Sequence, residues 1–272
     1  MRGKGRIYQK KLAHKRRRRA LWLIFFALSA GTLIFFCLAF VSQLRALSIQ
    51  HVNVTGVSSL STTAIQNLIV DAVSGNYLGF FSKANVLIYP KQKIIDTLYA
   101  SPSVKHVSVS KDSFNVISIA VTGRSEASQW CEGGIGSSSP CFSMDEAGFI
   151  FAPALAPSQG FIYRGLVTLD PVGKTLLPEA DFKKIEFFVQ ELRGLSLAPR
   201  EAVFESVDYA TIVLAGGGKL VINMSDDLSA VLSNISAIIT DRTVTPSLSH
   251  FLSTLDYLKL DTGEKVIYKV RK

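Results

Sequence analysis

The chain has 272 residues, of which 48% are apolar and 19% are charged, and its formal net charge is +9. This composition excludes a mainly disordered chain. Ten of the 30 Lys and Arg residues lie within residues 1–19, whereas all later positions together carry 20 basic and 21 acidic residues. The positive charge is therefore confined to a short tail, and the near-neutral remainder argues against a nucleic-acid-binding body, which needs a basic face of its own.

Residues 20–41 form a stretch of 22 residues without a charge, ALWLIFFALSAGTLIFFCLAFV. At about 1.5 Å rise per residue, a helix of this length spans roughly 33 Å and crosses a hydrocarbon core of ~30 Å. A cleavable signal peptide has a shorter apolar core, of about 7–15 residues, followed by a small-residue cleavage site. Ala39-Phe40-Val41 is a poor site of this kind. We therefore expect an uncleaved transmembrane helix over residues 20–41.

The basic tail, residues 1–19, predicts the orientation of this helix. Basic residues that flank a span hold that end in the cytoplasm, and they also contact the lipid bilayer. Beyond the span, Arg45 is the only Lys or Arg in the next 40 residues. We therefore expect a single-pass protein of the cytoplasmic membrane, with its N-terminus in the cytoplasm and all residues from about Ser42 outside.

The residues after the span predict an α+β unit of about 80 residues. The expected elements are a strand over 47–54, a helix that follows Thr63 and ends at Gly75, a loop at 79–81, a helix between Pro90 and Pro102, and strands over 104–109 and 116–121. Both helices carry one apolar face. They should therefore cover one side of a three-stranded sheet.

The second half predicts a mostly antiparallel β domain with two helices. The expected elements are a hairpin of 141–144 with 149–152, a short strand over 166–169, a helix capped by Asp181 that runs to about Arg193, a meander of 203–209, 211–214 and 219–223, a helix that begins after Ser225-Asp226-Asp227, and a final hairpin of 255–260 with 265–270 over Thr262-Gly263. Alternating apolar positions, turn residues and helix-capping residues support these assignments.

Cys131 and Cys141 flank a Gly- and Ser-rich loop, CEGGIGSSSPC, whereas the third cysteine, Cys37, lies in the span. Outside the cytoplasm, two close cysteines favour a disulfide. A tetrahedral metal site would need two further ligands, and the four His residues are scattered along the chain. Two free thiols are the remaining alternative.

Several short patterns, in this order along the chain, resemble the FtsQ/DivIB family of bacterial cell-division proteins. They are Val52-x-Val54-x-Gly56, Pro102-x-Val104, Ile119-x-Val121 with Arg124 and Trp130, Asp145 with Gly148-x-x-Phe151, and the closing pair Tyr257-Leu258-Lys259-Leu260 and Val266-Ile267-Tyr268-Lys269. The chain departs from the family at Gly123, where Glu is usual, and at Lys259 and Asp261, whose charges are exchanged. The cysteine-flanked loop is an insertion relative to the common pattern.

The resemblance implies four parts: a basic cytoplasmic tail (1–19), a transmembrane helix (20–41), a POTRA-type β-α-α-β-β domain (47–124) and an FtsQ/DivIB-like β domain (125–272). It also implies a non-enzymatic scaffold of the divisome at the septum. The implied partners are FtsB/FtsL-like coiled-coil division proteins and other divisome components. An anchored POTRA protein that assists polypeptide secretion or envelope assembly is the alternative. Such a protein usually carries repeated POTRA units or a β-barrel, and the sequence shows neither.

The final strand, Lys265 to Val270, is the candidate partner-binding site. A C-terminal strand often forms the edge of its sheet, where a partner strand can pair with it. The family resemblance points to the same region, because there the C-terminal hairpin receives a strand from FtsB. The candidate residues are Lys265, Val266, Ile267, Tyr268, Lys269 and Tyr257, with Tyr268 as the expected anchor. The alternative is that Val266, Tyr268 and Val270 merely face the core.

No catalytic motif emerges from the sequence. Lys219 follows three glycines, but a strand and not a helix comes after it, so a hairpin turn is expected rather than a phosphate-binding loop. Gly173-Lys174-Thr175 lacks the first glycine of that motif, and neither G-x-S-x-G nor H-E-x-x-H is present. We therefore predict no catalytic residue, cofactor, metal or small-molecule substrate, although an envelope enzyme without a familiar motif remains an alternative.

Overall fold

The structure is a computed structural model that describes residues 4–56, 62–113, 115–156, 160–167, 170–243, 245, 247–262 and 265–271. The chain divides into two units, and each is described by itself. The first comprises Met1–Ala100 and His106–Thr122, and the second comprises Ser101–Lys105 and Gly123–Lys272. The expected α+β class is confirmed, with an apolar helix near the N-terminus and a large, mostly antiparallel sheet.

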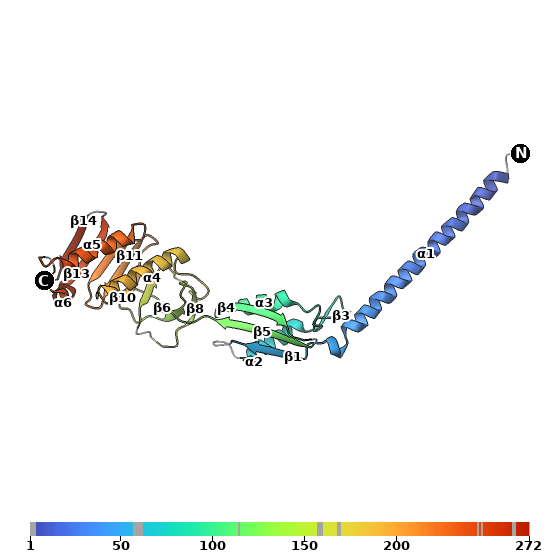
Figure 1. The fold of residues 1–272 in the computed structure, drawn as a ribbon, viewed down its shortest axis with the longest axis horizontal. Coiled ribbons are helices and arrows are strands. Elements are labelled where there is room, and N and C mark those ends of the chain that lie inside the picture. The colour runs from blue at the N-terminus through green and yellow to red at the C-terminus, as the bar shows by residue number, and fades with distance from the viewer. Residues whose placement is uncertain are drawn as a thin grey trace. The chain divides into compact units, whose positions relative to one another are not determined.

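The first helix, α1, runs without interruption over Lys4–Ser42 (Figure 1). Its segment Leu21–Ser42 has a mean hydropathy of 2.5 and is long and apolar enough to cross a membrane. Within the described residues no other helix meets this criterion. The expected span over 20–41 therefore coincides with this segment to within one residue at each end.

The rest of the first unit carries a three-stranded sheet with two longer helices. Its elements are the 3-10 turn Arg45–Leu47, β1 His51–Thr55, α2 Thr62–Val73, β2 Asn76–Tyr77, β3 Phe81–Ser82, α3 Lys91–Tyr99, β4 Val104–Lys111 and β5 Val116–Gly123. The sheet order is β1-β5-β4, and β1 runs parallel to β5. The two-stranded hairpin β2–β3 forms a separate small sheet.

One face of the three-stranded sheet is buried. Ile117, Ile119 and Val121 of β5 are almost fully buried, whereas Ala120 between them is exposed. Because side chains on a strand alternate between faces, this pattern places the core on one side only. The helices supply the opposing apolar side chains, which are Ile65, Ile69, Ala72, Ile94 and Leu98. The apolar faces of α2 and α3 are thus buried, as the sequence predicts.

Two expectations for the first unit were wrong. The first strand begins at His51 and not at residue 47, because Arg45–Leu47 form a 3-10 turn. The loop expected over residues 79–81 ends one residue earlier, because Gly79 and Phe80 lie in the turn of the hairpin β2–β3 whereas Phe81 begins β3. Leu78 and Gly79 close this hairpin with φ values of 50° and 78°. Phe80 completes this three-residue loop. Two successive positive φ angles are typical of hairpin turns, and Leu is an unusual residue for such a conformation.

The second unit is built on a nine-stranded sheet with the order β14-β13-β12-β11-β10-β9-β6-β7-β8. The strands are β6 Ser128–Cys131, β7 Cys141–Met144, β8 Ile150–Pro153, β9 Ile162–Gly165, β10 Pro199–Phe204, β11 Tyr209–Leu214, β12 Lys219–Asn223, β13 Leu255–Thr262 and β14 Lys265–Val270. Neighbouring strands are antiparallel except for the pairs β12–β13, β9–β10 and β6–β9, which are parallel. These parallel pairs require the chain to cross over, and helices make two of the crossovers.

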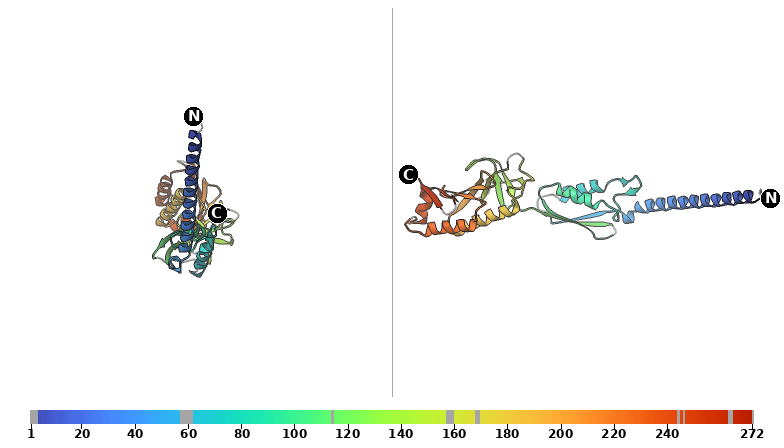
Figure 2. Two further views of the ribbon diagram at one scale, coloured as in Figure 1. Left: turned by 90° about the vertical axis from the view of Figure 1, so that its right-hand side faces the viewer. Right: turned by 90° about the horizontal axis from the view of Figure 1, so that it is seen from above.

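Three helices pack on this sheet in the described residues: α4 Glu179–Gly194, α5 Leu228–Thr240 and α6 Leu248–Thr254. Figure 2 shows α4 and α5 along one side of the sheet. The core includes Phe182, Ile185, Phe188 and Leu192 of α4 and Ile235 of α5. The side chain of Asp227 caps α5 by accepting a hydrogen bond from the Ser229 N–H. The sequence therefore predicted the buried face of both longer helices.

Other boundaries in the second unit were wrong. β9 lies at Ile162–Gly165 instead of 166–169, and Leu169 falls outside the described residues. Asp181 lies in the first turn of α4, which begins at Glu179 after Pro178, so Asp181 is not its cap. β10 begins at Pro199 and not at residue 203. The short elements β6 and α6 were not expected, and Gly263 of the final turn lies outside the described residues.

Candidate partner-binding edge strand

β14 is the last strand of the nine-stranded sheet, paired on one side with β13. In the antiparallel register, Tyr268 lies opposite Leu258, Ile267 opposite Lys259, and Lys269 opposite Tyr257. An edge strand presents alternate N–H and C=O groups away from its only neighbour. β14 therefore offers a row of backbone groups to which another extended segment can pair.

One face of β14 is apolar and only partly covered. Val266, Tyr268 and Val270 share this face with Leu258, which is buried in the core. Val266 packs against the core, whereas Tyr268 is 49% exposed and Val270 is 47% exposed. On this face of β14, Val266 is thus the residue that contacts the core, and Tyr268 and Val270 are half-exposed. A strand added to β14 would bury more of both.

The opposite face of β14 combines charge and apolar surface. Lys269 Nζ lies 3.1 Å from an Asp256 carboxylate oxygen and 5.9 Å from the centre of the Tyr257 ring. Ile267, on the same face, is 47% exposed. Charged side chains on an edge strand discourage indiscriminate pairing. Lys269 forms an ion pair with Asp256, so this face carries a paired ammonium group beside the exposed side chain of Ile267.

The C-terminal end of β14 is anchored by Arg271. Its backbone N–H donates to the Thr254 carbonyl at 2.7 Å. Its Nη2 donates to the carbonyls of Gly216 and Leu255 at 2.8 and 2.7 Å. These bonds connect the strand end to the β11–β12 turn. They therefore hold the backbone of β14 in its extended conformation at this end.

The structure brings together most of the predicted site residues, but on two faces. Tyr257, Ile267 and Lys269 lie on one face of the β13–β14 hairpin, and Val266 and Tyr268 lie on the other. Lys265 pairs with Thr262 in the backbone register, and its side chain is outside the described part. Sequence reasoning named Val270 only as a residue that could face the core, and it did not include Asp256 and Arg271. The alternation of Val266, Tyr268 and Val270 in the sequence was enough to include Val270 in the site, whereas no pattern indicated Asp256 or Arg271.

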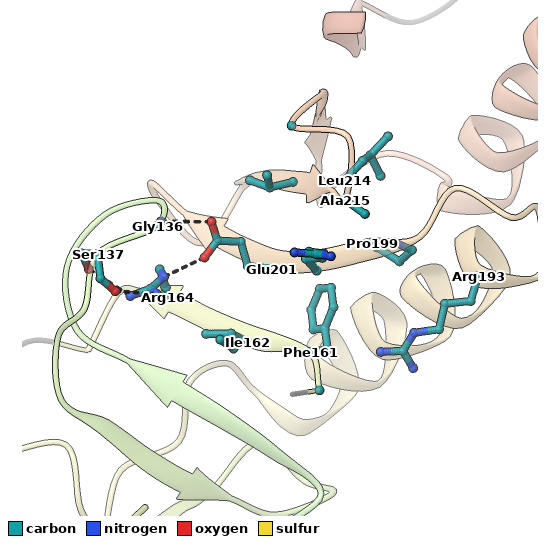
Figure 3. A pocket seen from close by; sticks show the side chains of 14 residues that line it. Gly136, Ser137, Phe161, Ile162, Arg164, Arg193, Pro199, Glu201, Leu214 and Ala215 are labelled. Atoms are coloured by element: carbon teal, nitrogen blue, oxygen red, sulfur yellow. Dashed lines mark hydrogen bonds and ion pairs between the residues drawn. The ribbon is translucent and has the colours of Figure 1, made fainter. Parts of the chain in front are cut away.

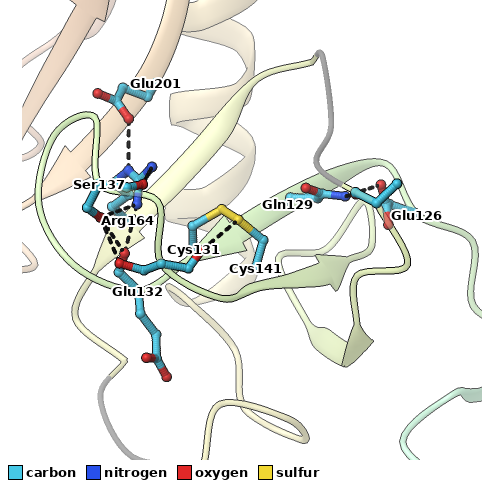
Figure 4. Close-up of a disulfide and its surroundings, with 10 residues drawn as sticks. Glu126, Gln129, Cys131, Glu132, Ser137, Cys141, Arg164 and Glu201 are labelled. Atoms are coloured by element: carbon cyan, nitrogen blue, oxygen red, sulfur yellow. Dashed lines mark hydrogen bonds and ion pairs between the residues drawn. A yellow bond between two sulfur atoms is a disulfide. The ribbon is translucent and has the colours of Figure 1, made fainter.

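Cys131 and Cys141 form a disulfide between β6 and β7 (Figure 4). The two residues lie directly opposite each other in the antiparallel register, so the bond closes the loop of residues 132–140 at its base. Inside the loop, Ser137 Oγ donates to the Glu132 carbonyl at 3.1 Å. The loop is therefore tied covalently at its base and by hydrogen bonds within.

A buried ion pair holds the same loop against the sheet. Arg164 on β9 and Glu201 on β10 are both largely buried, and Arg164 Nε lies 2.8 Å from a Glu201 carboxylate oxygen. Arg164 also donates to the carbonyls of Glu132 and Ser137 at 2.7 and 3.0 Å. The second Glu201 oxygen accepts the Gly136 N–H at 3.2 Å. Sequence reasoning missed this pair, because two charges 37 residues apart give no local signal.

The Arg164–Glu201 pair lies at one end of an open depression of about 840 Å³ (Figure 3). Phe161, Arg193 and Leu214 also line it. The Arg193 guanidinium lies 5.7 Å from the centre of the Phe161 ring. Because the Arg164 guanidinium is already occupied by Glu201 and the loop carbonyls, it is a structural group rather than a waiting anion ligand.

The motif residues Arg124 and Asp145 form an ion pair within the second unit. Asp145 is buried, and one of its carboxylate oxygens accepts the N–H groups of Ala147 and Phe149 at 2.9 and 3.0 Å. The Arg124 guanidinium lies 4.0 Å from the centre of the Phe149 ring. Arg124 and Asp145 therefore stabilise the β7–β8 turn, and their pattern in the sequence has a structural explanation.

Among the side chains that the structure describes, no three His, Cys, Asp or Glu residues gather closely enough to hold a metal ion. Comparison of the chain with protein-family models gives no match, and no curated protein matches its sequence.

Proposed function

We propose that the chain is a non-enzymatic, membrane-anchored scaffold of the bacterial divisome, of the FtsQ/DivIB type. In this proposal α1 crosses the cytoplasmic membrane, and the rest of the first unit and the whole second unit lie on its outer side. The first unit is a POTRA-type domain, a proposal supported by its β-α-α-β-β order apart from the small β2–β3 hairpin. The second unit binds a division partner of the FtsB/FtsL kind during septum formation.

The observation that carries the proposal is the open edge at β14. It combines unpaired backbone groups, half-exposed Tyr268 and Val270 on one face, and half-exposed Ile267 on the other. A partner segment that pairs with β14 gains main-chain hydrogen bonds, and its alternate side chains cover the exposed apolar groups on each face. The Arg271 anchor lowers the ordering cost of this event because the strand end is already held.

Capture of partners from cells tests the proposal. The full chain, carrying an affinity tag, is extracted in mild detergent, and co-purified proteins are identified by mass spectrometry. We expect small single-span coiled-coil division proteins. Recovery of translocation or barrel-assembly components instead would support the secretion alternative and contradict the divisome assignment.

Paired substitutions then locate the interface. Tyr268→Ala should weaken partner capture at least tenfold, which corresponds to about 1.4 kcal/mol, because a half-exposed Tyr at the centre of an edge is a typical hot spot. Tyr209→Ala is the matched control, since Tyr209 on the inner strand β11 is 41% exposed. Equal effects of the two substitutions would remove β14 from the interface.

Proline substitutions test backbone pairing separately from side-chain contacts. Successive residues of a strand direct their N–H groups to opposite sides, so either Ile267 or Tyr268 donates toward the open edge. Proline removes that donor. One of Ile267→Pro and Tyr268→Pro should therefore abolish capture while the circular dichroism spectrum stays unchanged. Capture retained by a folded form of both variants would contradict strand addition.

A further inference from the structure

Four apolar side chains are exposed on the β2–β3 hairpin and in the turn after it. Leu78 is 86% exposed, Phe80 44%, Leu87 62% and Ile88 42%. The segment 76–90 that contains them carries one charge, Lys83. A group of large exposed apolar side chains within one short segment indicates a site of interaction with protein or membrane.

This hairpin packs against the apolar segment of α1. The ring of Phe35 lies 5.4 Å from that of Phe80 and 5.3 Å from that of Phe81, centre to centre. Phe36 lies 6.3 Å from Phe80 in the same way. The aromatic contacts therefore join the hairpin to the helix well before the helix ends at Ser42.

Hydrogen bonds fix the hairpin in this place. Gln43 Nε2 donates to the Phe80 carbonyl at 3.0 Å, and the Ser82 N–H donates to Ser42 Oγ at 2.9 Å. Asn85, which is buried, donates through Nδ2 to the Ser42 carbonyl at 2.9 Å. This bond satisfies a carbonyl that the end of a helix leaves without a partner.

The position of Phe35 sets the depth of the hairpin. Phe35 precedes Ser42 by seven residues, which is about 10 Å along the helix axis. The segment Leu21–Ser42 is only slightly longer than a hydrocarbon core of ~30 Å is thick. Side chains that contact Phe35 thus lie at the level of the outer leaflet, and not in the water above it.

We propose that the β2–β3 hairpin and Leu87–Ile88 form a second membrane contact, which inserts Leu78, Phe80, Leu87 and Ile88 into the outer leaflet beside α1. This proposal rests on the proposed membrane anchoring by α1. The occupant of the apolar surface is lipid, because Phe80 packs on Phe35 and Phe36 in the apolar segment of α1. The contact attaches the first unit to the membrane at a second place beside α1.

The polar groups of the hairpin fit this location. In lipid, backbone groups require internal partners, and the Phe80 and Lys83 N–H groups donate to Tyr77 and Gly75 at 3.0 and 3.1 Å. Lys83 Nζ lies 5.6 Å from the centre of the Tyr77 ring. Lys and Tyr are typical of the membrane interface, where a long basic side chain reaches the headgroups.

Spin labels on the full chain test this contact. The chain is reconstituted at one copy per nanodisc of phosphatidylethanolamine and phosphatidylglycerol, with the Cys131–Cys141 bond intact. Three proteins carry one label each: on native Cys37 in α1, on Leu78→Cys, and on Gln66→Cys of α2, the last two in a Cys37→Ala background. Power saturation compares collisions with oxygen, which concentrates in lipid, to collisions with a water-soluble nickel chelate.

We expect the oxygen-to-nickel ratio at position 78 to exceed that at position 66 severalfold and to approach that at position 37. Adding Phe80→Asp to the Leu78→Cys protein should lower the ratio at 78 toward that at 66. A ratio at 78 equal to that at 66, with lipid contact at 37, would overturn this contact alone. Protection of position 78 from both reagents would show a protein cover and overturn it as well. Water contact at 37 would overturn both this contact and the proposed anchoring.

Discussion

Arg164 and Glu201 show how a charged pair defines the place of the loop of residues 132–140. Their mutual attraction offsets the cost of removing both charges from water only because further polar groups complete the network. Two loop carbonyls and the Gly136 N–H supply these groups. The pair therefore selects one position for the loop of residues 132–140 against β9 and β10.

Breaking this pair from one side should be costly. Arg164→Met leaves the Glu201 carboxylate buried without its cation, and we expect the free energy of unfolding to fall by about 3–5 kcal/mol. The double variant Arg164→Met/Glu201→Met should lose clearly less than the two single variants together. Urea unfolding of the original chain, the two single variants and the double variant, followed by tryptophan fluorescence, measures these free energies. Additive losses would mean that the two side chains do not interact.

Tyr163 makes the stability of the second unit sensitive to alkaline pH. Burial raises the pKa of Tyr163 above its ordinary value of 10.0, Glu186 raises it further, and Arg193 acts in the opposite direction. The folded state therefore holds its proton where the unfolded state loses it, and the free energy of unfolding falls as the pH rises above about 10. Tyr163→Phe should flatten this fall in urea titrations at pH 9 to 11. An unchanged slope would contradict the assignment.

The hairpin β6–β7 depends on its cross-strand disulfide. The bond joins two cysteines that are ten positions apart in sequence, and the chain-entropy relation gives about 2.5–3 kcal/mol for so short a ring. Non-reducing mass spectrometry of the purified chain should show a mass two hydrogens below the reduced form. Cys131→Ser/Cys141→Ser should lower the free energy of unfolding by about that amount, whereas Cys37→Ser should not. Complete alkylation of all three cysteines without reductant would disprove the bond.

Amphipathic helices were predictable because their pattern is local. In α5, Leu228, Val231 and Ile235 recur at helical spacing after the capping Asp227, and all three are buried. β6 and β9 were not predictable, since short inner strands are covered on both faces and lose alternation. In β6 three consecutive residues, Gln129, Trp130 and Cys131, are buried. Their neighbours in the sheet come from distant parts of the chain, so no local pattern marks them.

The charge asymmetry of the chain makes a prediction about its orientation in the membrane. Residues 1–19 hold ten basic residues and no acidic one, and such a charge bias should retain this end in the cytoplasm. A reporter enzyme that works only outside the cytoplasm should be active when it is fused after Lys272. The same reporter fused after Arg19, without the apolar segment, should be inactive. Cytoplasmic activity of a fluorescent reporter fused after Lys272 would contradict this topology.

The long apolar segment of α1, the α+β class and the candidate final strand follow from amino-acid order alone. Charge, apolar length and periodicity act over a few consecutive residues, so they can be read without the fold. The edge position of β14 is different, because it depends on the pairing of all nine strands, three of whose junctions are parallel crossovers. The half-exposed state of Tyr268 likewise depends on which residues of the fold pack against that face of β14.

The same distinction separates the apolar segment of α1 from the hairpin beside it. Twenty-two uncharged residues predict a span by their length, whereas Leu78 and Phe80 look like ordinary core residues in the sequence. Only the folded chain brings Phe80 and Phe81 against Phe35 and leaves Leu78 without cover. Exposure is a property of three-dimensional packing, and side chains that meet across more than forty residues of sequence leave no trace in local periodicity.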